Sequence, residues 1–467
     1  MANRRTAAPV QLPAFVRRLA SDEYAAPPLS ERDQHVRAAV RERGVASAAR
    51  LALAPGAYWA SRRGTAAGLR ALNAAAGRKW YRVPAEAELD ADAADACLGG
   101  DEVVIDVQTH FVADRPECAR WNRTLRALYA SVAPEWWHGL DDVTAYDMTA
   151  WLRCVFGESE TAAAVLTSAP GTGPDRMLHD RELAGVRALF ERLGGGGRLF
   201  NHCVVQPERR GGIEAMRAAH ERFAPIGWKV YTLGGGSADD PAPGGWFLDD
   251  ETTGVPFLEQ VRASGVRRVC AHKGISGLVP TGSPRDVGPA AAAFPDLEFL
   301  IYHSGYEIPA SAAPEEGPYS DAVAHVGTNR LVASLHGAGI GPGANVFAEL
   351  GSTWFCLIRR PEEAAHVLGK LLLAVGEDNV LWGTDAIWYG SPQPAIDAFR
   401  AFQIPADLRD RYGYPELTPQ VKAKVLGRNA ARIYGLDLER ARAARDDLSW
   451  LRPLMDEVAA RGVPEVD

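Results

Sequence analysis

The sequence lacks the patterns that mark membrane proteins and disulfide frameworks. No apolar run approaches the roughly 20 residues that a membrane-spanning helix needs. The six cysteines are scattered, at positions 97, 118, 154, 203, 270 and 356, and no two form a Cys-x-x-Cys pair. Such spacing favours reduced thiols over disulfides or a zinc–thiolate site. Arg4-Arg5 is followed by a proline-broken segment, so a twin-arginine export signal is not expected. We therefore expect a cytoplasmic protein without a membrane partner.

Positive charge is concentrated near the start of the chain. Residues 1–80 contain 14 Lys/Arg and 5 Asp/Glu, although the net charge of all 467 residues is −8. A helix is predicted for Ser30–Leu53, with Ser30 as its N-cap. Charge runs are usually solvated faces, so a helical arm packed on an acidic remainder or on a partner subunit is the first interpretation. The alternative is a landing surface for an anionic substrate, such as a phosphate-bearing carrier. Basic and aromatic residues do not interleave here, which disfavours nucleic acid.

Eight segments have the composition of buried strands and alternate with helical segments. They are Val103–His110, Ala163–Ser168, Leu199–Gln206, Gly227–Tyr231, Arg267–His272, Leu297–His303, Asn345–Glu349 and Asn379–Asp385. This alternation predicts an α/β fold in which parallel strands close into a (β/α)8 TIM barrel. The carboxyl ends of the strands then meet at one face, where barrel enzymes carry their chemistry. We predict a helical basic N-terminal extension (1–101), the barrel (102–440) and a helical C-terminal tail (441–467).

Metal-binding side chains stand on several of these strands. Gln108 and His110 are two positions apart on the first strand, so they point to the same side. Lys229 lies within an apolar strand, where an ammonium is costly unless it is paired or modified. Three interpretations of Lys229 remain open. It is carboxylated to an anionic ligand, it stays an ammonium that orients the substrate, or its head reaches solvent.

Four more candidates end later strands. His272 and His303 each follow an apolar run, and Glu349 and Asp385 end the seventh and eighth strands. A lone histidine in such a place is more often a hydrogen-bonded structural residue, but two in register favour a metal site, because imidazole is a common ligand. Asp385 after an apolar strand needs charge compensation from a metal or a protonated base.

In this order the motifs resemble the amidohydrolase superfamily, in particular its branch of metal-dependent aryl-acid decarboxylases and hydrolases. The resemblance extends from about Val104 to Leu436 and includes a closing helix at Val421–Leu436. It implies a distorted (β/α)8 barrel with one or two divalent metals. By this resemblance His110 matches the second histidine of the first-strand pair, and Lys229 the position that is often carboxylated. His272, His303 and Asp385 match the ligands of the fifth, sixth and eighth strands.

Two positions depart from the family pattern. Gln108 stands where the family has its first histidine, and Glu349 adds a carboxylate at the seventh strand. Oxygen donors disfavour tetrahedral zinc and favour octahedral iron or manganese. We therefore expect two divalent metals, with iron favoured over manganese or zinc. Of the interpretations of Lys229, a carboxylated lysine could bridge the two metals. The expected ligand set is Gln108, His110, Lys229, His272, His303, Glu349 and Asp385.

Aromatic residues are dense in the segments expected around the barrel mouth. They indicate either ordinary packing or a large apolar substrate pocket. The candidate pocket residues are Trp136, Trp137, Tyr231, Trp354 and Trp388.

Two enzymatic hypotheses follow. In the first, Asp385 is the general base of a hydrolase or non-oxidative decarboxylase of a small carboxylic acid, with Lys229 and His303 as further catalytic candidates. The second is favoured by the two departures. With these departures the chain resembles the amidohydrolase-type diiron monooxygenases of platensimycin and platencin biosynthesis. That resemblance implies two irons that activate dioxygen to hydroxylate a bulky apolar, diterpenoid-like substrate or its coenzyme A thioester.

The oxygenase hypothesis needs an external reductant, since no flavin, haem or ferredoxin motif is visible. A third, remote hypothesis is a degenerate barrel that only binds. The expected partners are a small-molecule substrate and a second copy in a homodimer, with no nucleic acid.

Overall fold

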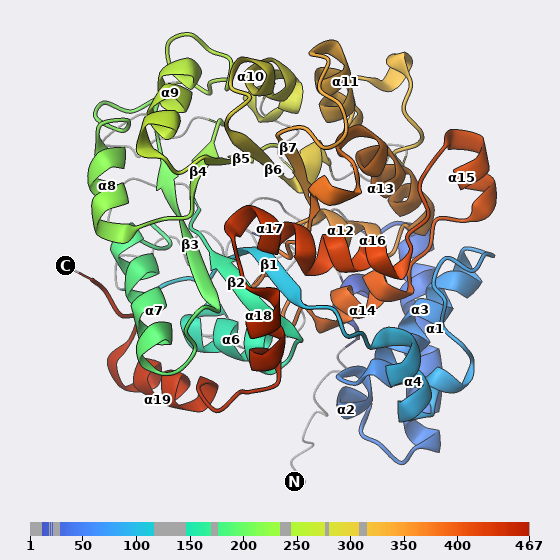
Figure 1. The fold of residues 1–467 in the computed structure, drawn as a ribbon. Coiled ribbons are helices and arrows are strands. Elements are labelled where there is room, and N and C mark those ends of the chain that lie inside the picture. The colour runs from blue at the N-terminus through green and yellow to red at the C-terminus, as the bar shows by residue number, and fades with distance from the viewer. Residues whose placement is uncertain are drawn as a thin grey trace, which may run out of the picture.

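The computed structural model describes residues 12–17, 19, 21, 29–115, 146–169, 176–233, 244–275, 280–307 and 315–466. Eight parallel strands pair in chain order and form the centre of the molecule (Figure 1). They are β1 (Val104–Thr109), β2 (Thr161–Leu166), β3 (Leu199–Val205), β4 (Gly227–Tyr231), β5 (Arg268–His272), β6 (Glu298–Tyr302), β7 (Val346–Glu349) and β8 (Val380–Leu381). The predicted TIM barrel is confirmed.

The last strand is much shorter than the predicted segment Asn379–Asp385. Beyond β8 the backbone still bonds to β1, with Val107 N donating to the Trp382 carbonyl (3.0 Å) and Asp385 N to the Gln108 carbonyl (2.9 Å). Asp385 has a φ of 59°, a left-handed conformation that an extended strand does not contain. The barrel therefore closes through single hydrogen bonds, and this closure holds Asp385 beside β1.

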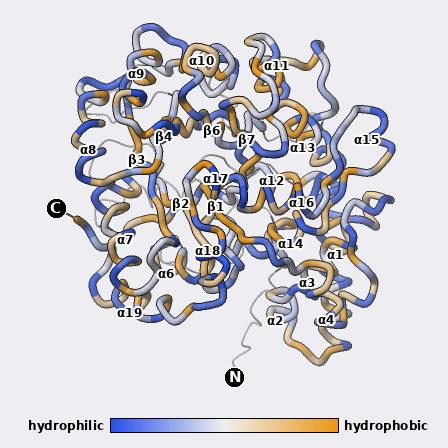
Figure 2. The backbone as a smooth tube through the Cα atoms, in the orientation of Figure 1, coloured by the Kyte–Doolittle hydropathy of each residue, from blue (hydrophilic) through white to orange (hydrophobic). Residues whose placement is uncertain are grey.

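Helices form the outer layer around the strands (Figure 1). In α7, the buried residues Leu183, Val186 and Phe190 share one side of the helix, as the 3.6-residue period requires. Figure 2 shows hydrophilic stretches on outer helices such as α8 and α15. The outer helices are α6 (Met148–Leu152), α7 (Asp180–Arg192), α8 (Ala215–Phe223), α9 (Gly254–Ser264), α10 (Val287–Ala293), α11 (Asn329–Gly337), α12 (Thr353–Leu357), α13 (Pro361–Val375), α14 (Gln393–Ala401) and α15 (Ala406–Tyr412).

The basic N-terminal region folds into helices that lie on one side of the barrel (Figure 1). These are α1 (Glu31–Arg50), α2 (Pro55–Trp59), α3 (Arg62–Ala75) and α4 (Ala91–Leu98). The predicted N-cap is confirmed, because the Ser30 side chain accepts from Asp33 N and the Asp33 carboxylate accepts from Ser30 N. None of the helices in the described part of the chain combines the length and apolarity needed to cross a membrane.

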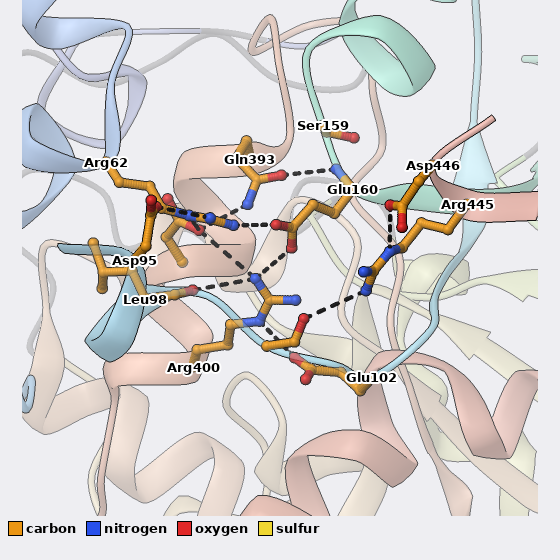
Figure 3. A network of polar contacts seen from close by, with 12 residues as sticks. Arg62, Asp95, Leu98, Glu102, Ser159, Glu160, Gln393, Arg400, Arg445 and Asp446 are labelled. Carbon is orange, nitrogen blue, oxygen red and sulfur yellow. Dashed lines mark hydrogen bonds and ion pairs between the residues drawn. The ribbon is translucent and has the colours of Figure 1, made fainter. Parts of the chain in front are cut away.

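A polar network joins these helices to the barrel (Figure 3). Arg62 of α3 pairs with Glu160, which precedes β2, and with Asp397 of α14. Glu160 also accepts from Arg400 of α14, which in turn pairs with Glu102 before β1. Burial raises the pKa of Asp397 to about 6, while the nearby Arg62 opposes this. Arg62 thus ties the arm to acids of the barrel.

A broken helix lies against the start of β1. It consists of α16 (Pro419–Ala423), a π-helical turn (424–428) and α17 (Asn429–Tyr434), and it covers most of the predicted closing helix. The tail continues in α18 (Leu438–Arg445) and α19 (Leu451–Arg461). Gly427 packs so closely on β1 that a Cβ atom there would lie 2.0 Å from the Val103 carbonyl oxygen. Only glycine allows this approach.

Gly427→Ala is expected to lower the free energy of unfolding by about 1–3 kcal/mol, because the new methyl group meets backbone that cannot move aside. The matched control is Gly337→Ala at the end of α11, where a Cβ meets nothing within 4 Å. This control is expected to stay within about 1 kcal/mol of the wild type, in either direction. Urea denaturation of the three proteins measures both effects. Equal stabilities for the two variants would contradict the packing described here.

Candidate functional site

The seven predicted ligands all lie on or just after barrel strands, and each side chain is at most 1% exposed. Gln108 belongs to β1, Lys229 to β4, and His272 and Glu349 are the last residues of β5 and β7. The others follow strand ends directly or within a few residues: His110, His303 and Asp385. Residues that are far apart in the sequence thus reach one end of the barrel. Their role as ligands remains a prediction.

His110 and Asp385 face each other across the closure between β1 and β8. The Nδ1 atom of His110 lies 2.9 Å from the Thr167 carbonyl oxygen. Because a carbonyl only accepts, Nδ1 carries the proton, and Nε2 of the neutral ring has a lone pair. Nε2 lies 3.1 Å from Asp385 Oδ1. Two acceptors at this distance repel each other unless a cation, either a second proton or a metal ion, lies between them.

Gln108 completes this group. Its Nε2 donates to Asp385 Oδ1 over 3.0 Å, so the amide orients the carboxylate. Its Oε1 is buried, and no hydrogen-bond partner for it is found among the described residues. A buried amide oxygen without a partner is costly, and a cation is one of the few groups that would satisfy it. The amide that replaces the family's histidine therefore both positions Asp385 and offers an oxygen donor.

His303 and His272 form a second group next to the first. His303 Nδ1 lies 2.7 Å from the Gly351 carbonyl oxygen, which again assigns the proton to Nδ1. The rings of His272 and His303 meet edge to face, with 4.8 Å between their centroids. Tyr231, a predicted pocket residue, stacks on His272 at 5.0 Å. In histidines that bind a metal through one ring nitrogen, the other nitrogen typically donates a hydrogen bond to a backbone carbonyl or a carboxylate.

Glu349 is held by backbone groups. Its carboxylate accepts from His303 N (3.0 Å) and from Gly351 N (2.6 Å), so it fixes the chain on which His303 stands. Burial raises the pKa of Glu349 to about 7, and the nearby His303 opposes this. A Cβ at Gly383 would lie 1.7 Å from Glu349 Oε1, and one at Gly351 would lie 2.4 Å from Gln108 Oε1. Because Gly351 and Gly383 have no side chain, they leave room for Gln108 and Glu349, the two residues that depart from the family pattern.

Lys229 points into the barrel. Its Nζ lies 3.5 Å from the centroid of the Tyr302 ring and 4.8 Å from that of Tyr231. Aromatic faces attract an ammonium, so this contact is compatible with a charged lysine. Carboxylation of Lys229 stays a prediction.

The backbone is strained where the ligands stand. His303 (65°), Ser304 (52°), Ser352 (54°) and Asp385 (59°) are non-glycine residues with positive φ. Each such conformation costs about 1–3 kcal/mol and is found mainly where function requires it. The strained backbone indicates that the turns after β6, β7 and β8 form a functional site.

Sequence reasoning missed Ser352, and it considered Tyr389 only as one of the aromatic residues expected near the barrel mouth. The Ser352 hydroxyl donates to Asp385 Oδ2 and therefore accepts from the Tyr389 hydroxyl, which lies 2.5 Å away. The Tyr389 ring stacks on Phe355, with 3.8 Å between centroids. Neither residue sits at a strand end, and a serine in a loop has no distinctive pattern. The only local signal is the glycine pair, Gly351 and Gly383, next to the two acidic strand ends.

A small apolar cavity borders Ser352 and Tyr389. It is lined also by Trp354 and Phe355, so the predicted pocket residue Trp354 does line a cavity. Trp388 instead packs on Tyr146, with 5.2 Å between ring centroids. Trp136 and Trp137 lie outside the described residues. The predicted substrate pocket, Trp354 and Tyr231 included, stays a prediction.

The donor chemistry of the site fits a metal ion. In the described part of the chain, no three His, Cys, Asp or Glu side chains stand in an arrangement that would hold a metal as it is. The donors instead form the two groups described above, with Gln108 Oε1 and Glu349 Oε1 both near Gly351. The fixed tautomers of His110 and His303 and the unsatisfied Gln108 oxygen are what a metal site of nitrogen and oxygen ligands requires.

Comparison with known proteins gives one family and a set of distant structures. The family described as Amidohydrolase matches residues 78–436. No curated protein sequence matches the chain. Crystal structures of 5-carboxyvanillate decarboxylase from Sphingomonas paucimobilis (17% identity, TM-score 0.41) and 2,6-dihydroxybenzoate decarboxylase from Rhizobium (15%, 0.42) each cover 72% of this chain and are themselves covered to 99%. A 2-pyrone-4,6-dicarboxylic acid hydrolase from Pseudomonas putida (16%, 0.40) covers 72% and is covered to 98%. Similarity at this level says nothing about what this chain converts.

The raised pKa of Glu349 predicts a pH dependence of the metal-free protein. Since its ordinary value is 4.5 and its folded value about 7, the folded state binds more protons between these limits. Its contribution to stability is therefore complete below about pH 4.5 and is lost as pH rises through 7, by up to about 1.4 kcal/mol per pH unit. Glu349→Gln should remove this part of the slope. Denaturation with a chelator present, between pH 5 and 8, measures it, and identical slopes in both proteins would contradict the assignment.

Proposed function

The chain belongs to the amidohydrolase family, and on that premise we propose that it is a metal-dependent enzyme that hydrolyses or decarboxylates a small carboxylic acid. The observation that carries the proposal is the contact of 3.1 Å between His110 Nε2 and Asp385 Oδ1, two atoms that need a cation between them. Hydrolysis and non-oxidative decarboxylation are the chemistries that the family resemblance implies.

Histidine and carboxylate side chains would hold the metal. His110 and Asp385 would provide one pair of donors, and His303 and His272 another. Gln108 Oε1 and Glu349 would add oxygen donors. A bound divalent cation supplies Lewis acidity for a substrate oxygen or a water molecule. Iron, manganese and zinc all accept such nitrogen and oxygen ligands, and the oxygen donors favour iron or manganese.

The chain's own residues orient the substrate and handle the proton. Asp385 is fixed at Oδ1 by the Gln108 amide and at Oδ2 by the Ser352 hydroxyl, so its carboxylate is aligned to take up or release a proton. Ser352 and Tyr389 extend this hydrogen-bonded chain to the wall of the apolar cavity. Lys229, as an ammonium, can pair with a substrate carboxylate. The complete burial of these groups keeps bulk water away and strengthens each charge interaction.

Metal content tests the ligand set. His110→Ala is expected to remove most of the bound iron, manganese or zinc while the far-ultraviolet circular dichroism stays unchanged, because it deletes a donor and little packing. The matched control is His366→Ala, a buried histidine of α13 that contacts Tyr414 and lies outside the predicted ligand set. Metal analysis of protein purified without added metal decides the question. Full occupancy in His110→Ala would remove this residue from the ligands.

A second candidate is the diiron monooxygenase. One observation favours it. The side-chain oxygens of Gln108 and Glu349 occupy the room left by Gly351 and Gly383, so two further oxygen donors lie next to the histidines. More oxygen donors suit a redox-active metal better than zinc. This candidate requires dioxygen and electrons from an external reductant, with a bulky apolar acid or its thioester as substrate.

Product formation with and without dioxygen separates the two candidates. For hydrolysis or decarboxylation, turnover of small aromatic carboxylic acids is expected to continue under strict anaerobiosis, and Gln108→His, which restores the family's residue, is tolerated. For the oxygenase, turnover requires both dioxygen and a reductant, and Gln108→His lowers it at least tenfold, because the redox properties of a metal depend on its ligands. Strictly oxygen-dependent turnover would end the first proposal in favour of the second.

A further inference from the structure

Arg17 is a buried cation in an unusual environment. It directly follows the short 3-10 helix Ala14–Val16 and is 7% exposed. Its guanidinium atoms Nε and Nη1 are buried, and neither has a hydrogen-bond partner among the described residues. Arginines that are buried to this degree are nearly always paired, since an unpaired buried charge is costly.

The charges around Arg17 increase this cost. Burial is the main reason why the pKa of Arg17 is lowered to about 10, and the nearby positive charge of Arg37 lowers it further. The Tyr146 hydroxyl acts in the opposite direction but more weakly. A neutral hydroxyl does not compensate a buried guanidinium next to a second cation. Among the described residues, no acidic side chain offsets this cost.

Arg17 lines a cleft of about 1110 Å³ between the N-terminal helices and the barrel. Of the other three arginines on its wall, Arg62, Arg63 and Arg153, two are paired with acids. Arg62 pairs with Asp95 and Glu160 (Figure 3), and Arg153 lies 3.3 Å from Glu158 with more than half of its side chain exposed. The acids of the wall are therefore already engaged. Arg17 is left to meet whatever enters the cleft.

The cleft also borders the candidate active site. Tyr389, whose hydroxyl bonds to Ser352 and through it to Asp385, lines both the cleft and the small apolar cavity. Ala14, three residues before Arg17, lines both as well. The two cavities therefore share wall residues next to the hydrogen-bonded chain that leads from Tyr389 to Asp385.

We propose that Arg17 forms an anion-binding subsite that takes an oxyanion, a carboxylate or a phosphate, carried by the distal part of the substrate. A guanidinium can match the two oxygens of such an anion with two parallel N–H groups, and an entering anion must displace part of the wall that buries Nε and Nη1. The assignment of that anion to the substrate rests on the proposed function, whereas the binding of an anion at Arg17 does not. Within the basic arm, Arg17 then binds an anion, while Arg62 holds the arm to the barrel.

Anion binding is tested directly with the full-length, metal-loaded protein. Inorganic phosphate and acetate are titrated at constant ionic strength, with chloride as the reference, and the melting temperature and calorimetric heat are followed. A saturable rise in melting temperature is expected for the wild type. Arg17→Gln is expected to weaken the binding at least tenfold, and Arg17→Lys to retain part of it. Phosphate binding without acetate binding assigns a phosphate-bearing substrate, and the reverse assigns a carboxylate.

Arg153→Gln is the matched control, because it removes a charge from the same wall at an exposed and paired position. It is expected to bind phosphate like the wild type. Without anions, Arg17→Gln is expected to melt at the same or a higher temperature than the wild type, because it removes an uncompensated buried charge.

Two results would overturn the subsite. One is an equal phosphate response in the wild type and Arg17→Gln, which would place the anion elsewhere, for example on the metal. The other is a wild type that does not respond to either anion. If Arg17→Gln does not fold, a phosphate-soaked crystal of the wild type decides, since the ion must appear within hydrogen-bond distance of the guanidinium. Because no step uses turnover, a failure here is distinct from a failure of the proposed function.

Discussion

Closure of the barrel between β1 and the segment after β8 is the constraint on which the site depends. The bond from Asp385 N to the Gln108 carbonyl brings the first and last strands together and places the Asp385 carboxylate beside Gln108 and His110. Since β8 has only two residues, the left-handed conformation of Asp385 turns the chain at the point where its side chain is needed. The same short stretch of backbone therefore closes the fold and sets the distance between the two acceptors that need a cation.

Space and strain around this closure explain how the unusual residues are accommodated. Gly351 and Gly383 leave room for the Glu349 carboxylate and the Gln108 amide, and Glu349 uses that position to hold the backbone of His303. Strained conformations persist only when the surrounding packing imposes them. Here the barrel imposes them, so its stability maintains a site that would be unfavourable by itself. The two departures from the family pattern are thus supported by neighbouring glycines.

The N-terminal helices connect the site with the outer surface of the barrel. Their arginines are used in two ways. Arg62 is neutralised by acids of the barrel and holds the arm in place (Figure 3), whereas Arg17 is buried with no such partner among the described residues. The ion pairs of Arg62 fix the arm on the barrel, and the fixed arm keeps Arg17 at the edge of the cleft. The basic segment is thus held on the barrel by Arg62, and Arg17 is the residue at which we propose that it binds an anion.

The sequence by itself determined the barrel, its eight strands and the strand ends that carry Gln108, His110, His272, His303 and Glu349, because apolar composition and strand alternation are local properties of the chain. It also identified Ser30 as an N-cap, which depends on residues only three positions apart. Only the tertiary structure decided that β8 stops at Leu381, that Ser352 and Tyr389 hold Asp385, and that the buried Arg17 meets no acid among the described residues. Those features depend on backbone turns and on which distant side chains meet after folding, and no local pattern records either of them.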